Sequence, residues 1–165
     1  MATFQWVQYL KEHTKTSKVY GMPDSGLFLT DFYSPIVEKK VIRVETENLL
    51  KLVGKDEKEL PGPVRKCIEK LDDLVSCYDA SNYAENIHAP LFLIQSTYDF
   101  WVIKNLLVTK CPTNSQPPFS IANCNETTRA AIKEYCHAVV KAIYKIRGDR
   151  KDVGIWGPAC VQHGF

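Results

Sequence analysis

The stretch that decides the fold is Pro90-Leu91-Phe92-Leu93-Ile94-Gln95, in which four consecutive apolar residues stand between a proline and polar residues. Strands in the middle of a parallel sheet are buried on both faces, so they read as continuous apolar runs rather than as alternating patterns. We therefore expect a central parallel strand here, buried on both faces.

The rest of the chain alternates between helical and extended patterns. Ser34-Pro35 is a favourable N-cap and first-turn pair for a helix, and Pro23 to Gly26 is a turn. We expect helices through Phe4, Val7 and Leu10, from Ser34 to Gly54, from Val64 to Leu74, and from Asn125 to Gly148. The further strands expected are Lys18 to Met22 and Gly154 to Trp156. This alternation predicts an α/β fold with a mostly parallel sheet flanked by helices.

Composition argues against several classes of protein. The 165 residues carry a net charge of +2, and the basic side chains alternate with acidic ones, so the nucleic-acid-binding class is not indicated. No apolar run approaches the roughly 20 residues of a membrane span. The opening residues also lack the pattern of a signal peptide. The densest mixed charges, Glu38 to Lys40 and Arg43 to Glu47, predict a solvated helix face.

Six cysteines are many for a reducing compartment, and none forms a CxxC metal pair. The spacings suit two local disulfide loops, Cys67 with Cys77 and Cys111 with Cys124, although six cysteines allow 15 connectivities. Asn125-Glu126-Thr127 is an N-glycosylation sequon. A disulfide-type set without a signal peptide suggests that the true N-terminus is missing.

Three residues that could carry chemistry follow the expected strands. They are Asp24, Asp99 and His163, and functional side chains gather beyond the carboxyl ends of parallel strands. The order Asp then His is that of the second half of an α/β-hydrolase. On this interpretation His163 is the general base, and Asp99 fixes its tautomer and stabilises the imidazolium. The alternative is that each aspartate is a turn or cap residue and that His163 lies near the terminus by chance.

Three segments are more specific. Residues 89–101, from Ala89 through Tyr98-Asp99 to Trp101, closely resemble the segment of the pectinacetylesterase and Notum-like carboxylesterase family that carries its triad acid. Asp24-Ser25-Gly26-Leu27-Phe28-Leu29 is similar to a second family block, although Leu27 replaces its usual aromatic residue. Residues 156–163, Trp156 to His163, are similar to the block that carries the triad histidine. The three blocks span the chain in the family's order.

The resemblance implies one partial α/β-hydrolase-type domain over residues 1–165, the C-terminal part of a longer esterase domain whose N-terminal half is missing. It implies catalytic roles for Asp99 and His163, and Asp24 and Ser25 become candidates for the substrate pocket. The family's serine turn, of the type G-x-S-A-G-G, is not in the sequence. Ser25 lacks the strand–turn–helix setting of such a nucleophile. Cys160 is expected to lack its partner.

The implied activity is hydrolysis of acetyl or other acyl esters through an acyl-enzyme, with O-acetylated polysaccharide or a lipid acyl ester as substrate and no metal or organic cofactor. The implied location of the full-length parent is extracellular or within the endomembrane lumen. The alternative function is an inactive fragment from a truncated gene, acting at most as a carbohydrate- or partner-binding module. The oligomeric state is not predicted.

Overall fold

The computed structural model describes residues 2–14, 18–53, 60–107, 111 and 120–164. The main helices are α1 (Ala2–His13), α2 (Val41–Val53), α3 (Gly62–Leu71), α4 (Ala80–Tyr83) and α5 (Glu126–Arg147). The shorter turns of helix are η2 (Ser76–Tyr78), η3 (Ala84–Asn86) and the π-helical η4 (Val102–Leu106). The strands are β1 (Leu91–Ile94), β2 (Tyr98–Asp99), β3 (Val153–Trp156) and β4 (Val161–Gln162).

Both strand pairs are parallel, as the sequence predicted. Strand β1 pairs with β3, and β2 pairs with β4. The prediction of a continuous strand at Lys18–Met22 is wrong. Within this segment Gly21 makes an isolated parallel bridge to Leu91, and Asp24, two residues after it, makes another to Ile94. Pro23 stands between the two bridges and has no N–H to donate, so a continuous ladder cannot form.

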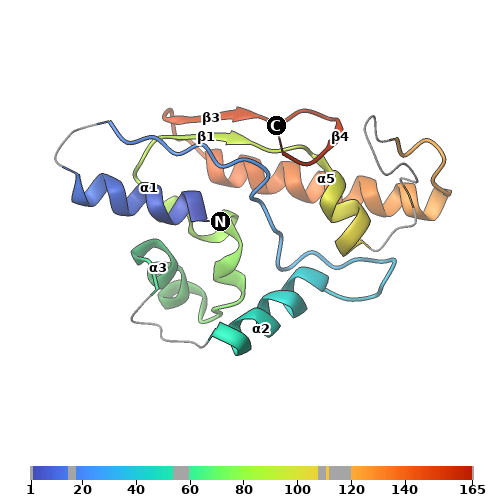
Figure 1. The fold of residues 1–165 in the computed structure, drawn as a ribbon, viewed down its shortest axis with the longest axis horizontal. Coiled ribbons are helices and arrows are strands. Elements are labelled where there is room, and N and C mark those ends of the chain that lie inside the picture. The colour runs from blue at the N-terminus through green and yellow to red at the C-terminus, as the bar shows by residue number, and fades with distance from the viewer. Residues whose placement is uncertain (1, 15–17, 54–59, 108–110, 112–119, 165) are drawn as a thin grey trace.

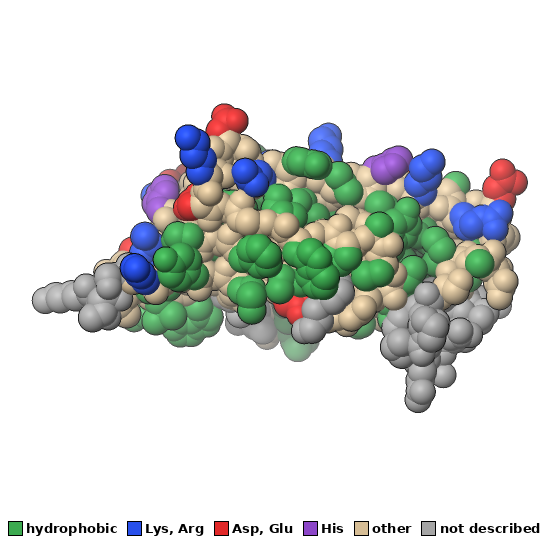
Figure 2. Space-filling model, turned by 90° about the horizontal axis from the view of Figure 1, so that it is seen from above, with side chains coloured by type: hydrophobic (Ala, Val, Ile, Leu, Met, Phe, Trp, Pro, Cys, Tyr) green, Lys and Arg blue, Asp and Glu red, His purple; other side chains and the backbone are tan. Residues whose placement is uncertain are grey.

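The prediction that β1 is buried on both faces is wrong for the described residues. Leu91 and Leu93 point into the core, but Phe92 on the opposite face is 46 % exposed. Phe92 pairs with Gly154 of β3, where an added Cβ would stand 2.5 Å from the Phe92 ring, so only glycine leaves the ring this position. Figure 2 looks down on the strand side of the molecule and shows hydrophobic side chains gathered on that surface.

Helices α1 and α5 cover the other face of the strands (Figure 1). Asn125 caps α5 by accepting a hydrogen bond from the Thr128 N–H at 2.8 Å, and Gly148 follows the helix with a φ of 45°. The apolar side chains along one face of this helix are all buried. They are Ile132, Cys136, Val139, Ile143 and Ile146.

Helix α2 begins later than predicted. Instead of capping a helix, Ser34 pairs with Lys39 in an isolated antiparallel bridge, and the Ser34 N–H donates to the Lys39 carbonyl at 3.0 Å. Glu38, which lies in the loop between the two bridged residues, has a left-handed φ of 53°. The helical run can therefore start only at Val41, about two turns after Ser34. The predicted end at Gly54 lies outside the described residues.

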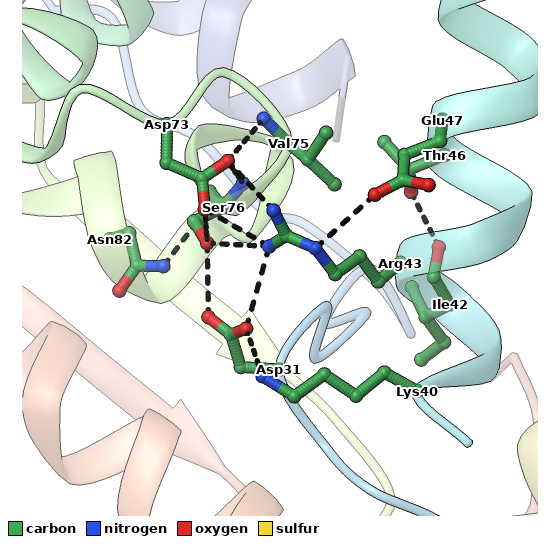
Figure 3. A network of polar contacts seen from close by, with 10 residues as sticks. All are labelled: Asp31, Lys40, Ile42, Arg43, Thr46, Glu47, Asp73, Val75, Ser76 and Asn82. Atoms are coloured by element: carbon green, nitrogen blue, oxygen red, sulfur yellow. Dashed lines mark hydrogen bonds and ion pairs between the residues drawn. The ribbon is translucent and has the colours of Figure 1, made fainter.

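Glu38 to Lys40 and Glu45 are exposed, as predicted, although residues 38–40 precede α2. Arg43 is the exception to the predicted solvated face, because it is half-buried in a polar network (Figure 3). Its guanidinium makes two hydrogen bonds to the Asp73 carboxylate, at 3.0 and 3.2 Å, and its Nε lies 3.3 Å from Glu47. Nη1 also lies 3.6 Å from Asp31 and donates to the Ser76 hydroxyl. The hydrogen bonds from Arg43 outweigh partial burial and lower the pKa of Asp73 from 3.8 to about 2. Arg43 thus ties α2 to the connection between α3 and η2.

Candidate active site

Asp99 and His163 lie in contact. His163 Nδ1 is 3.0 Å from Asp99 Oδ1 and 2.9 Å from Asp99 Oδ2. The parallel pairing of β2 with β4 sets this geometry, because Asp99 lies opposite Gln162 and the histidine follows immediately. The sequence predicted that these two residues meet, and the structure brings them together.

The contact assigns the histidine tautomer. A carboxylate only accepts hydrogen bonds, so Nδ1 is assigned the proton, and in the neutral ring Nε2 keeps its lone pair. Asp99 is 1 % exposed, whereas the His163 side chain is 35 % exposed, which makes the ring the solvent-facing member of the pair. The Trp101 ring lies 6.1 Å from the imidazole, measured between ring centroids.

Asp99 is held by three donors in addition to its strand. The Val102 N–H donates to Oδ1 at 3.1 Å, and the Gln95 side-chain amide donates to Oδ2 at 3.3 Å. Together with His163 Nδ1, these donors give the buried carboxylate three hydrogen bonds in place of water. A buried charge without such partners would cost the folded state much free energy. The arrangement can hold an imidazole in one orientation and stabilise its protonated form.

Ser25 and Asp24, the predicted pocket residues, lie at the carboxyl end of β1, where Asp24 bridges to Ile94. The Ser25 hydroxyl donates to Asp24 Oδ1 at 2.9 Å and accepts the Gly164 N–H at 2.9 Å. Ser25 has a left-handed φ of 51° and is 6 % exposed. Its hydroxyl therefore contacts the loop of His163 through Gly164 rather than the imidazole itself.

An apolar hollow of about 430 Å³ adjoins Trp101, the ring neighbour of His163, although neither Asp99 nor His163 lines it. Trp101 joins the hollow to the pair, since its ring neighbours His163 and also packs edge-to-face on Phe28 at 5.8 Å. The opposite wall belongs to α2. Its apolar lining side chains are Phe28, Val41, Ile42, Leu49, Trp101 and Leu106, and its polar ones are Glu45, Thr46 and Asn105.

Sequence reasoning missed two residues of this region. In the sequence Gln95 stands only as the polar boundary of the apolar run, yet its side chain is 1 % exposed and donates a hydrogen bond to Asp99. The Ser96 hydroxyl donates to the Cys160 carbonyl, which holds the segment before His163. A polar side chain placed directly after a buried strand is the signal that could have identified both.

The structure forms the two disulfides that the cysteine spacings predicted. Cys67 is bonded to Cys77 and Cys111 to Cys124, while Cys136 and Cys160 are free. Asn125 uses its side-chain oxygen as the cap of α5, and the structure carries no observation on its glycosylation. Within the described ranges, no group of His, Cys, Asp and Glu could hold a metal ion, and no helix is both long and apolar enough to cross a membrane.

Comparison with known proteins identifies the family. The pectinacetylesterase family matches residues 1–165, the whole chain. The chain belongs to the pectinacetylesterase family. Its resemblance to that family, inferred from the segments around Asp24, Asp99 and His163, is thereby confirmed.

Two relatives place this pectinacetylesterase-family chain in context. Pectin acetylesterase 5 of Arabidopsis thaliana is 28 % identical over 174 residues, which cover 99 % of the chain and 38 % of the relative. The structure of the Wnt deacylase Notum from Drosophila matches 95 % of the chain with a TM-score of 0.61 at 18 % identity, and this covers 38 % of Notum. That likeness supports the partial α/β-hydrolase-type fold. The chain thus spans about two fifths of the length of either protein.

Proposed function

We propose that this chain supplies the acid and the base of a serine carboxylesterase, with Asp99 and His163 as two members of its triad, in the C-terminal part of one esterase domain. The observation that carries the proposal is the Asp99 carboxylate 2.9 Å from His163 Nδ1. This contact leaves Nε2 as the nitrogen that can accept a proton from a serine hydroxyl. Family membership supports ester hydrolysis as the reaction class.

The mechanism follows from this tautomer. A serine oxygen attacks the ester carbonyl while His163 Nε2 takes the hydroxyl proton, and Asp99 stabilises the resulting imidazolium. The imidazolium returns the proton to the departing alcohol, which leaves an acyl-serine. Water then attacks the acyl-serine with His163 again as base, and the carboxylic acid and the serine are released.

The serine is proposed to come from outside the 165 residues. The sequence contains no G-x-S-x-G turn. Ser25, the serine of the first family block, is buried and its hydroxyl is engaged with Asp24 and Gly164. A nucleophile must instead lie within hydrogen-bonding reach of its base, and in the described part of the chain no serine hydroxyl is bonded to His163.

We infer the substrate class from the relatives and from the hollow beside Trp101. The names of the relatives point to an acetyl ester of pectin and to an acyl ester removed from Wnt. We assign the substrate as an acyl ester, with O-acetylated polysaccharide as the first candidate. The apolar hollow is the place for the acyl group. The two disulfides and the Asn125 sequon support a secreted parent protein.

The second candidate function is a non-catalytic binding module. It is favoured by the same observation on Ser25, because an acid–histidine pair without a nucleophile forfeits most of the triad's rate enhancement. The discriminating feature is the in-frame sequence upstream of Met1. A G-x-S-x-G turn there supports the hydrolase, and its absence supports the binding module.

The proposal is tested with p-nitrophenyl acetate. The 165-residue chain is expected to hydrolyse it no faster than a histidine-only background. A protein extended upstream through the serine turn is expected to be active and to lose about 10³-fold or more of kcat with His163→Ala. Strong turnover by the short chain that Ser25→Ala abolishes would make Ser25 the nucleophile and overturn the assignment.

A further inference from the structure

The turn Asp24–Leu27, hereafter the 24–27 turn, is fixed directly to the central strand. Asp24 bridges to Ile94 of β1, and the Ser25 N–H donates to the Ile94 carbonyl at 2.8 Å. Because backbone hydrogen bonds to a strand hold both partners, the turn keeps a set position at the carboxyl end of β1.

Ser25 joins this turn to the histidine side of the pair. Its hydroxyl accepts the N–H of Gly164, the residue after His163, at 2.9 Å. The backbone of Ser25 is left-handed, with a φ of 51°, and this conformation costs a non-glycine residue free energy. Glycine would adopt it without strain but would lack the hydroxyl. A strained residue held by its surroundings is a sign of a functional constraint.

Gln95 joins the same turn to the acid side. Its Oε1 accepts the Leu27 N–H at 3.1 Å, and its Nε2 donates to Asp99 Oδ2 at 3.3 Å. The two partners fix the orientation of the amide, since an N–H needs an acceptor and a carboxylate needs a donor. Nε2 also donates to the Ser96 carbonyl at 3.1 Å. The side chain is 1 % exposed, so removing it would leave the buried Leu27 N–H without its acceptor and Asp99 with one donor fewer.

We propose that the 24–27 turn is the positioning device of the acid–histidine pair, with Ser25 and Gln95 as positioning residues. Ser25 holds the loop that carries His163, and Gln95 holds the carboxylate of Asp99. Neither residue touches the reacting atoms; each acts through the pair. The catalytic meaning of this device rests on the proposed function, whereas the positioning itself is a property of the chain alone.

The experiment uses the 165-residue chain labelled with ¹⁵N. Nitrogen shifts of His163 report which ring nitrogen carries the proton, and hydrogen exchange reports the protection of the Gly164 N–H. The wild-type chain is expected to show a single Nδ1-protonated tautomer and a protected Gly164. Ser25→Gly keeps the left-handed backbone and removes the hydroxyl, so Gly164 should exchange roughly five- to ten-fold faster. Gln95→Met should produce a mixture of tautomers.

Thr30→Val is the matched control. Its hydroxyl is also buried, but it has no hydrogen-bond partner among the described residues. The control should leave both signals unchanged. A folded Ser25→Gly chain with unchanged Gly164 exchange, or a folded Gln95→Met chain with an unchanged single tautomer, would overturn the proposal. A wild-type Gly164 that exchanges as fast as an unprotected amide would also overturn it, without any variant.

These outcomes separate the two proposals. If the extended protein is inactive but the wild-type chain shows the expected tautomer and the protected Gly164 N–H, the hydrolase proposal is contradicted and the positioning proposal is supported. If the extended protein is active but neither substitution changes the His163 tautomer, the positioning proposal is contradicted and the hydrolase proposal is supported.

Discussion

At the scale of single residues, close packing places strict demands on Gly21. Its N–H donates to the Pro90 carbonyl at 2.9 Å, and its own carbonyl accepts the Phe92 N–H at 2.8 Å. A Cβ at this position would lie 2.8 Å from Leu91 Cδ2 and 3.2 Å from Val7 Cβ. The backbone is thus held by β1 while the side-chain space is filled by β1 and α1.

We expect Gly21→Ala to destabilise the chain by about 1–3 kcal/mol, because overpacking a filled site forces its neighbours to move. Gly157→Ala is the control, since a Cβ there would meet its nearest neighbours only at 3.8 Å, an ordinary van der Waals distance. Urea denaturation followed by circular dichroism measures both. Equal stability of the two variants would contradict the packing described at Gly21.

At the scale of elements, helix α2 depends on polar contacts as well as on packing. Arg43 makes the contacts to Asp73, which lies between α3 and η2, and to Ser76, which begins η2. Lys40, just before the helix, adds an ion pair to Asp31 at 2.8 Å. The same helix forms one wall of the apolar hollow beside Trp101. The Arg43 network therefore sets the position of that wall.

This network predicts an acid-sensitive step in stability. The pKa of Asp73 is depressed in the folded state, to about 2 against an ordinary 3.8. Its contribution to the free energy of unfolding is therefore present above about pH 4 and is lost as the pH falls toward 2. We expect this contribution to be on the order of 1 kcal/mol, after allowing for solvent screening.

Arg43→Met should remove most of that contribution and flatten the dependence of stability on pH between about 4 and 2. Lys70→Met is the control, because its ion pair with Glu85 is exposed on both sides and surface pairs contribute little. Denaturation curves at a series of pH values give the comparison. An Arg43→Met chain that keeps the wild-type slope would show that the network does not stabilise the fold.

At the scale of the whole molecule, helices cover only one face of the strands β1 and β3. Helices α1 and α5 lie beneath β1 and β3, and the other face of these strands carries exposed hydrophobic side chains (Figures 1 and 2). Alternation along the strands places the exposed members on one face. They are Tyr20, Met22, Phe92 and Trp156.

Such a face should bind a hydrophobic dye. We expect the folded chain to enhance the fluorescence of 8-anilinonaphthalene-1-sulfonate, and Phe92→Thr to reduce the enhancement several-fold, because contiguous apolar surface is what the dye detects. Leu52→Thr is the control, since Leu52 is 86 % exposed on α2, away from the sheet. An enhancement that both variants lower equally would show that the sheet face is not the binding surface.

The sequence by itself determined the parallel α/β character and the helix from Asn125 to Gly148, and it predicted the two disulfide pairs and the contact of Asp99 with His163. These features are local, or they follow from the rule that carboxyl ends of parallel strands share an edge. The tertiary structure decided that Phe92 faces outward, that Ser34 forms a bridge instead of a cap, and that Arg43 is engaged. It also gave Ser25 and Gln95 their partners, 139 and 68 residues away in the chain. Apolar runs show that a strand is buried but not what covers each face, and polar residues show no partner until the chain folds.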